Sequence, residues 1–446
     1  MHRRAFWPVF ILMSAALGCS SSTGSVRDIA CALQGVSPLV CNQGPSQPSD
    51  GPGGTPGVGG TETPAPSASA TLPPTPTLKP RIVLEVVYSQ AGNIWLWAET
   101  ALPKQLTGSG QDSVPKISDD GVVVAFRRNG ELWAVNADGT NERVLASAGA
   151  LAALPHTDSG GPLEPRFFDF APHSHDVYFN TMLIGNPFSV PQQDLAKANA
   201  DNPAVQSLLN DDQGGDEFTF SPDGTKIALA RSDKINVANA DGSGLKTVFT
   251  FPFVMLYSEA SYTPQVVWLP DASGFKTVIP AQDALGDPSA LTRFMFVPAD
   301  GSQAAQLAEF VAAPAFADRA NISPDGAKVL YAKPQGANLE LHVIDASTAD
   351  QMVFWYAASN FGVLGWAPDS IHFVYWIDDS RRTWLGSMGA QGIPLSDVTF
   401  ANKITWLDAN RYLFMNETEL RMRTLGQPSI LIESGVDEGF DFALAH

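Results

Sequence analysis

The sequence predicts an all-β protein, a β-propeller built from repeated four-stranded sheets, on three observations. The stretch "SPDGTKIALARSDKINVANADGSG" (221–244) returns 102 residues later as "SPDGAKVLYAKPQGANLELHVIDA" (323–346). Beyond Lys79, apolar residues fall in short runs with a period close to two, and no long stretch shows helical spacing. The unit recurs every 36–55 residues, which is the period of a propeller blade.

Two kinds of turn alternate along the chain and divide each unit into strands A, B, C and D. Proline pre-sets φ, Asp bonds to nearby backbone N–H groups and Gly accepts a left-handed φ, so both kinds predict tight hairpins. The first kind, between strands A and B, begins at Ser118, Ala171 (a degenerate member), Ser221, Pro270, Ser323, Ala367 and Leu407. The second kind, between strands C and D, begins at Asn136, Asn199, Asn239 and Pro298.

Seven such units are expected, and the two chain ends supply a further one. The units begin near Val114, Arg166, Glu217, Gln265, Ala320, Val363 and Lys403. Residues 82–107 match strands B, C and D with no A strand before them, and "GFDFALAH" from Gly439 matches an A strand with no B after it. Joining these ends makes a composite blade and closes the ring. We therefore expect eight blades, with seven as the alternative if a degenerate unit is misread.

The "SPDG" hairpin followed by a strand and "NADG" resembles the propeller repeats of the TolB family. Related repeats occur in the propellers of dipeptidyl-peptidase and prolyl-oligopeptidase enzymes. The resemblance covers about residues 81–446 and implies the propeller fold. TolB carries a folded α/β domain before its propeller, and the peptidases carry an α/β-hydrolase domain; neither has a counterpart in this sequence. The resemblance therefore implies neither binding of the TolB partner Pal nor peptidase activity.

The N-terminus predicts an exported, lipid-anchored protein. "MHRR" and the short apolar run 5–17 are typical of a signal peptide, expected to span residues 1–18. "ALGCSSS" resembles a bacterial lipoprotein processing site in which Cys19 receives the lipid, although Ala16 stands where leucine is usual. The alternative is an ordinary secretory signal and a secreted protein. We expect location in the bacterial cell envelope or at the cell surface, with membrane contact through this lipid only.

Residues 19–80 are expected to form a disordered linker rich in Pro, Gly, Ser and Thr, and residues 81–446 the propeller. Cys31 and Cys41 are the only other cysteines, so an exported chain is expected to pair them; two free thiols are the alternative. The net charge of −19 disfavours nucleic acid as a partner, because basic patches that would bind phosphates are not favoured on such a surface.

No catalytic motif stands out, and no cofactor is expected. His173 and His175 in "PHSHD" are spaced to share one face of a strand, which makes them weak candidates for a metal site; a solvated turn is the favoured interpretation. Asp138, Asp241 and Asp300 repeat on separate blades, which indicates turn chemistry and not a calcium cage. Trp268, Trp366 and Trp406 end A strands, where packing between blades is expected.

Two function classes remain. The favoured one is a non-enzymatic module that binds a protein, peptide or glycan. The alternative is a propeller enzyme of the lactonase or lyase kind, with its site in the central channel. Such enzymes need acids or histidines around the axis, and the chain has only seven histidines.

The sequence also predicts a binding face. Long segments at 147–163, 182–193, 250–262 and 281–291 are all D–A or B–C loops, which share one face of a propeller. Long loops on a rigid scaffold commonly carry function, although tolerated insertions are the alternative. The candidate contact residues are the apolar side chains Leu183, Ile184, Phe188, Phe251, Phe253 and Leu256.

If Cys19 carries lipid, the wild-type protein should partition into detergent, and Cys19→Ala should become soluble or stay unprocessed. Phase partitioning of the two proteins measures this, with Cys31→Ala as a control that should behave like the wild type. Identical partitioning of wild type and Cys19→Ala would remove the lipoprotein interpretation.

Overall fold

The computed structural model describes residues 83–445, except 157–160, 186–187, 258–259, 283–286, 288, 314–320, 347–350, 359–360, 378–381 and 399–400. The predicted signal peptide, the linker, Cys19, Cys31 and Cys41 lie outside the described residues.

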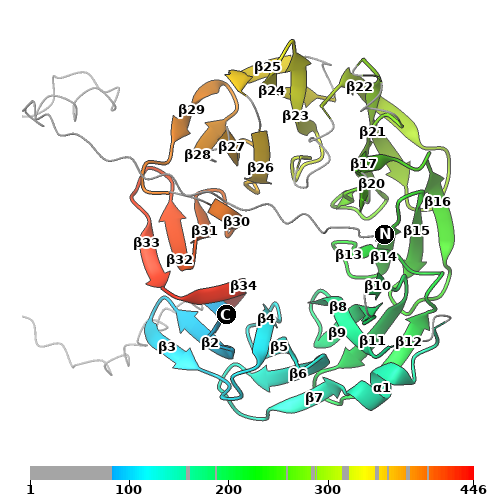
Figure 1. Cartoon of the computed structure of the whole chain (residues 1–446), viewed down its shortest axis with the longest axis vertical. Coiled ribbons are helices and arrows are strands. Elements are labelled where there is room, and N and C mark those ends of the chain that lie inside the picture. Colours follow the sequence, from blue (N-terminus) through cyan, green and yellow to red (C-terminus); the bar gives the residue numbers. More distant parts are fainter. Residues whose placement is uncertain are drawn as a thin grey trace, which may run out of the picture. The chain divides into compact units, whose positions relative to one another are not determined.

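The described residues form antiparallel sheets arranged in a ring (Figure 1). The first sheets along the chain contain β1 (Val83–Gln90), β2 (Asn93–Ala98) and β3 (Ala101–Gln105); then β4 (Asp112–Ile117), β5 (Val123–Arg128), β6 (Glu131–Asn136) and β7 (Arg143–Ala146); then β8 (Leu163–Phe170), β9 (Asp176–Leu183), β10 (Val190–Pro191), β11 (Leu195–Asn199) and β12 (Val205–Leu209). The next two contain β13 (Glu217–Phe220), β14 (Lys226–Ala230), β15 (Lys234–Asn239) and β16 (Lys246–Thr250); then β19 (Val267–Trp268), β20 (Gly274–Ile279), β21 (Leu291–Pro298) and β22 (Ala305–Val311).

The remaining sheets complete the ring. They contain β23 (Lys328–Gln335), β24 (Asn338–Asp345) and β25 (Gln351–Ala358); then β26 (Phe361–Trp366), β27 (His372–Ile377), β28 (Arg382–Ser387) and β29 (Ala390–Pro394); then β30 (Ala401–Trp406), β31 (Arg411–Asn416), β32 (Glu419–Thr424) and β33 (Ile430–Glu433); and last β34 (Val436–Ala445). A short helix, α1 (Ala148–Ala152), and a small hairpin of β17 (Met255–Tyr257) and β18 (Ala260–Ser261) lie in connecting segments.

The predicted all-β propeller is confirmed. Seven of the sheets have four or five strands and are complete blades. The sheet β23–β24–β25 has three strands, and an isolated bridge between Ile322 and Val329 stands where its inner strand is expected. Figure 1 draws this sheet in the ring between the β19–β22 and β26–β29 blades, at the place that the eight-blade expectation counts as a blade.

The composite blade joins the two ends of the propeller. Its strand order is β3–β2–β1–β34, and β34 pairs antiparallel with β1 from Val83 opposite Ala445 to Tyr88 opposite Phe440. Asp441 on β34 also accepts a hydrogen bond from the backbone N–H of Ile117 on β4, at 3.1 Å. The last strand therefore belongs to one blade and is tied to the next.

The two kinds of turn have different roles in the ring. In the first kind, the hydroxyl of Ser221 donates to Asp223 at 2.6 Å, and hydrogen bonds from Ser221 and Thr225 lower the pKa of Asp223 to about 2. The second kind also receives cations from the preceding blade. Lys104 donates to the backbone carbonyl of Asp138, and Lys246 donates to that of Asp300 at 2.6 Å.

The tryptophans that end A strands link neighbouring blades, as expected. Each indole N–H donates to a backbone carbonyl near the end of the inner segment of the preceding blade. Trp268 bonds to Thr219 at 3.1 Å, Trp366 to Asn321 at 3.2 Å and Trp406 to Gly365 at 3.4 Å. Because the rings are themselves buried, each hydrogen bond is protected from water and holds one blade in position against the next.

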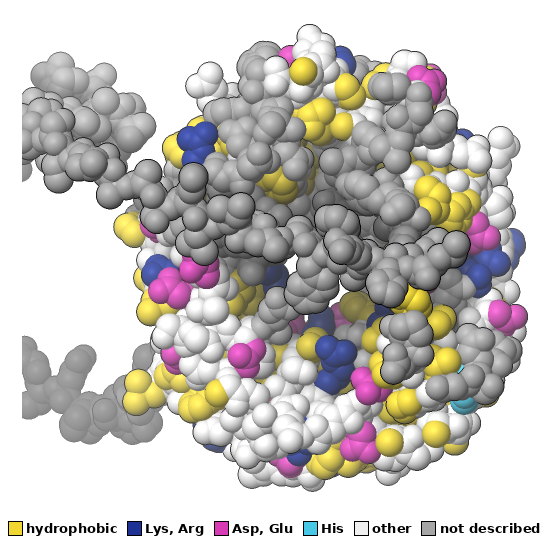
Figure 2. All heavy atoms as spheres, viewed as in Figure 1, with side chains coloured by type: hydrophobic (Ala, Val, Ile, Leu, Met, Phe, Trp, Pro, Cys, Tyr) yellow, Lys and Arg dark blue, Asp and Glu magenta, His cyan; other side chains and the backbone are white. Residues whose placement is uncertain are grey.

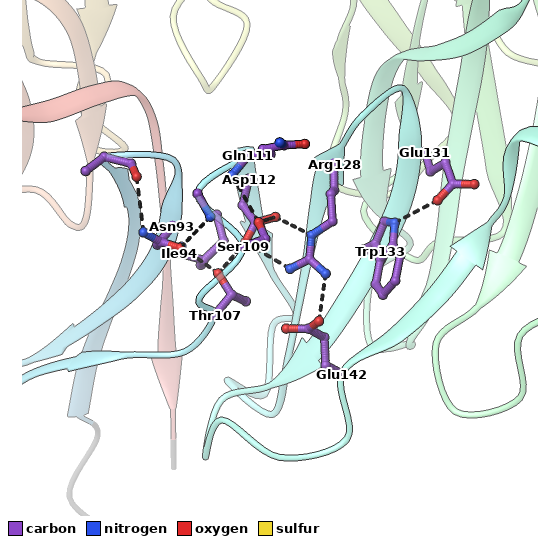
Figure 3. Close-up of polar contacts among 12 residues, drawn as sticks. Asn93, Ile94, Thr107, Ser109, Gln111, Asp112, Arg128, Glu131, Trp133 and Glu142 are labelled. Carbon is purple, nitrogen blue, oxygen red and sulfur yellow. Dashed lines mark hydrogen bonds and ion pairs between the residues drawn. The ribbon is translucent and has the colours of Figure 1, made fainter.

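A buried ion pair fixes the passage from the composite blade to the next one (Figure 3). Asp112, at the start of β4, accepts two hydrogen bonds from Arg128 at 2.5 and 3.0 Å, and its side chain has no exposed surface. Thr107 and Ser109 donate to the same carboxylate, and Arg128 also donates to Glu142. Removing one partner would leave a buried charge uncompensated.

Deleting residues 437–446 should destabilise the protein by about 3–5 kcal/mol or more, or cause aggregation, because it removes buried Phe440 and exposes the edge of β1. Thermal and urea unfolding measure the loss. Leu102→Ala is the matched control, since Leu102 lies in the same blade but is 89% exposed. Unchanged stability of the deletion variant would mean that the ring does not depend on this closure.

Candidate functional site

Hydrogen bonds sort the loops onto two faces of the propeller. On one face, B–C and D–A loops meet: Gln193 donates to Asp216 at 3.1 Å, and the N–H of Phe251 donates to the carbonyl of Asp233 at 3.0 Å. On the other face, A–B and C–D turns meet through His175, which contacts Asp120 and Asp201. The four long segments therefore belong to loop classes that share a face, which we call the long-loop face.

The candidate contact residues of the long-loop face divide into two groups. Phe188 and Phe253 are 79% and 48% exposed, so they are available to a partner. Leu183 and Phe251 were expected to be exposed, but both are buried in hydrophobic clusters between blades. Leu183 is the last residue of β9, and Phe251 directly follows β16, so both still pack with the strands of neighbouring blades. Ile184 is half-buried, and the side chain of Leu256 lies outside the described residues.

Other exposed apolar side chains join Phe188 and Phe253 in the long segments. They are Val190 on β10, Met255 on β17 and Leu291, where β21 begins. Figure 2 shows hydrophobic side chains in the part of the ring where Figure 1 labels β10 and β17. The exposed apolar side chains therefore lie on loops of neighbouring blades, from β8–β12 to β19–β22.

The loop 210–217 was not singled out from the sequence, although it reads "NDDQGGDE". It connects β12 to β13 and lies beside two of the long segments. The carboxylate of Asp216 accepts from Gln193 at 3.1 Å and from Thr263 at 3.5 Å. Gln193 is the last residue of the segment 182–193, and Thr263 directly follows the segment 250–262. Asp216 therefore lies between these two apolar loops.

The predicted metal candidates lie on the opposite face and differ in environment. The side chain of His173 is 83% exposed, as a solvated turn predicts. The side chain of His175 is only 20% exposed; its Nδ1 lies 2.8 Å from Asp201 and its Nε2 lies 3.1 Å from Asp120. The solvated-turn interpretation is therefore wrong for His175, which bridges an A–B turn of the preceding blade and a C–D turn of its own.

This environment favours a protonated His175. Burial alone would lower its pKa, but hydrogen bonds and charges from Asp201 and Asp120 outweigh burial and raise the pKa above its usual value. Both ring nitrogens then donate to carboxylates. Among the described residues, no group of three or more His, Cys, Asp or Glu side chains could hold a metal ion.

The inner wall of the ring carries a row of alternating charges that sequence reasoning also missed. Lys403 on β30, Asp441 on β34, Lys116 on β4 and Asp169 on β8 follow one another around neighbouring inner strands. Lys116 lies 3.3 Å from Asp169, and Lys403 donates to the backbone carbonyl of Phe440 at 2.8 Å. One signal in the sequence could have revealed the row: a charged residue at an A-strand position where apolar residues are common.

The row is electrostatically coupled. Burial within the wall raises the pKa of Asp441 and lowers that of Lys403, although part of Lys403 is exposed. Burial would also lower the pKa of Lys116, but Asp169 and Asp441 outweigh it and raise that pKa. Each cation therefore has a neighbouring carboxylate.

The repeated aspartates of the C–D turns cap their own turns, as expected. Asp138 accepts from the N–H and hydroxyl of Thr140, and Asp241 accepts from the same groups of Ser243. Asp300 accepts from the N–H of Ser302 at 2.8 Å. In the described part of the chain, no helix has the length and apolar character needed to cross a membrane.

No protein-family model and no curated protein sequence matches the chain. Solved structures do match. The chain is similar to the Dos1 propeller (10% identity, 78% of this chain and 86% of that one, TM-score 0.48). It is also similar to a manganese-bound oligogalacturonate lyase (13%, 66% and 82%, 0.44) and to TolB from Acinetobacter baumannii (14%, 61% and 63%, 0.31). The expected resemblance to TolB is thus found, and at these values it concerns the fold.

His175→Gln should lower the free energy of unfolding by about 0.5–1 kcal/mol at about pH 6, a modest loss because both carboxylates are half exposed. The raised pKa makes this contribution fully present below the pKa of the unfolded chain and lost as pH rises through the folded value. Urea unfolding at about pH 6 and about pH 9 tests it. His173→Gln should change little, and a wild-type-to-variant difference that is independent of pH would contradict the charge-based link.

Proposed function

We propose that this protein is a lipid-anchored binding module of the bacterial cell envelope, whose long-loop face captures a protein or peptide partner. One observation carries the proposal. Twelve large hydrophobic side chains are exposed among the described residues, and five of them lie in three long segments of neighbouring blades. The five are Phe188, Val190, Phe253, Met255 and Leu291.

The remaining exposed hydrophobic residues have a different distribution. They lie at the outer strands of blades, as Leu102, Ile393, Ile430 and Leu431 do, or at tight turns, as Val122 and Ile371 do, and Phe167 lies on inner strand β8. Single exposed apolar residues of this kind are normal on any protein. Phenylalanine and methionine are enriched in the cores of recognition surfaces, and Phe188, Phe253 and Met255 are exposed on loops of neighbouring blades.

The alternative, an enzyme with its site at the ring's centre, has the inner-wall charges in its favour. Lys403 combines partial exposure with a lowered pKa, which is a property of some reactive lysines. However, Lys116 pairs with Asp169 and Asp441 lies beside both lysines, so the row largely neutralises itself. The inner wall also holds the last strand in place, which accounts for these charges without a reaction.

A photo-crosslinking amino acid at position 188, on intact cells of the source organism, should yield an adduct with a partner. Ile393, 61% exposed on outer strand β29, provides the matched control position and should yield none. Adding Phe253→Ser to the position-188 protein should reduce the adduct at least about tenfold, because an aromatic anchor of the same face is removed.

The same variants should keep the wild-type melting temperature, since exposed side chains contribute little to stability. Equal adducts from positions 188 and 393 would contradict binding at the long-loop face. Adducts from position 119, on the tight-turn face, in place of position 188 would show that the partner uses the other side.

A further inference from the structure

The long-loop face has an excess of acidic residues in addition to its apolar residues. Its four long segments and the loop 210–217 contain eight acidic residues and no Lys or Arg. The chain as a whole has 27 basic residues for 46 acidic ones, so a region of this size without any base departs from the average. A partner that covers these loops would meet negative charge.

The structure places part of this charge between the apolar loops. Asp216 contacts Gln193 at the end of one long segment and Thr263 just beyond another. The carbonyl of Asp233, in the turn between β14 and β15, accepts from the N–H of Phe251, two residues before exposed Phe253. Asp216 and Asp233 therefore lie in loops that contact the segments carrying the exposed phenylalanines.

Asp212 of the loop 210–217 and Asp233 of the neighbouring turn 231–234 are open to solvent. Asp212 is exposed, and the side chain of Asp233 is 54% exposed. Arg231 is 18% exposed; its Nε lies 3.9 Å from the Asp233 carboxylate, and it donates to the carbonyl of Asp212 at 2.6 Å. Arg166 donates to the carbonyl of Asp216 at 2.8 Å. Arg231 and Lys234 offset part of the charge, but they are outnumbered by the five acids of 210–217 and 231–234, which are Asp211, Asp212, Asp216, Glu217 and Asp233.

We propose that the long-loop face recognises a segment that is both basic and apolar, presented by a protein partner. The inference rests on the proposed function and adds the chemistry of the partner. Exposed phenylalanines would receive apolar side chains, and Asp212 and Asp233 would pair with Lys or Arg at the rim. Rim charges of this kind mainly set orientation and association rate, so charge selects the partner and apolar burial holds it.

Three synthetic peptides of equal length test the proposal with the mature chain, through fluorescence anisotropy. One alternates Lys and Leu, one alternates Ser and Leu, and one alternates Glu and Leu. We expect the Lys–Leu peptide to bind about fivefold to tenfold more tightly than the Ser–Leu peptide, and the Glu–Leu peptide most weakly. Added salt should reduce the preference for Lys–Leu, since exposed charges are screened.

Matched variants locate the effect. Asp212→Asn with Asp233→Asn should remove the preference for Lys–Leu and leave the affinity for Ser–Leu unchanged. Asp119→Asn with Glu309→Gln removes the same charge from an A–B turn and from outer strand β22, and should preserve the preference. Phe188→Ser with Phe253→Ser should weaken the binding of both peptides.

The outcomes separate this inference from the proposed function. If Lys–Leu and Ser–Leu bind equally and both lose affinity in the phenylalanine variant, the basic partner is refuted while the binding face stands. If both pairs of acid variants reduce Lys–Leu binding equally, the preference reflects net charge only and the inference is also refuted. If the phenylalanine variant binds all peptides as the wild type does, the proposed function itself is refuted.

Discussion

The structure depends on a constraint that no blade can meet alone: a twisted four-stranded sheet has two faces to bury and two edges to protect. Stacking buries the faces, and the hydrophobic clusters lie between blades, as where Leu84 and Val86 of β1 pack with Leu413 of β31. A ring of stacked blades must still be closed, and the pairing of β1 with β34 closes it. This pairing joins the first and the last described strand of the chain.

Most of the polar side chains that link blades donate hydrogen bonds to backbone carbonyls, and this has consequences for sequence and for function. The indoles of Trp268, Trp366 and Trp406 and the ammonium groups of Lys104 and Lys246 all donate to main-chain oxygens of a neighbouring blade. Such acceptors exist whatever side chain is present, so the repeats can diverge while the ring persists. The tight turns become fixed by these contacts, which leaves the loops of the other face free to lengthen.

The repeat was readable from the sequence because turn chemistry is local. Ser221, Asp223 and Gly224 specify their hairpin within a few residues, and the starts of six units agree with the observed sheets, while the start expected near Ala320 lies outside the described residues. Burial in a loop is not local: Phe251 was expected on the surface but packs between blades, because its environment is set by a neighbouring sheet. The row from Lys403 to Asp169 and the role of His175 depend on which blades adjoin, so spacing alone did not reveal them.

The acidic residues of the chain therefore have two roles. In the tight turns, Asp138, Asp241 and Asp300 accept hydrogen bonds from residues two positions later, which lower the pKa of each carboxyl and commit it to the backbone. On the long-loop face, Asp212 and Asp233 are exposed in loops that contact the segments carrying Phe188 and Phe253 or their neighbours. The same residue type thus fixes the scaffold on one face and sets the electrostatic character of the other. The net charge of the chain disfavours nucleic acid as a partner, but it does not show this difference between the two faces. Only the carboxylates that do not cap turns are available to select a partner.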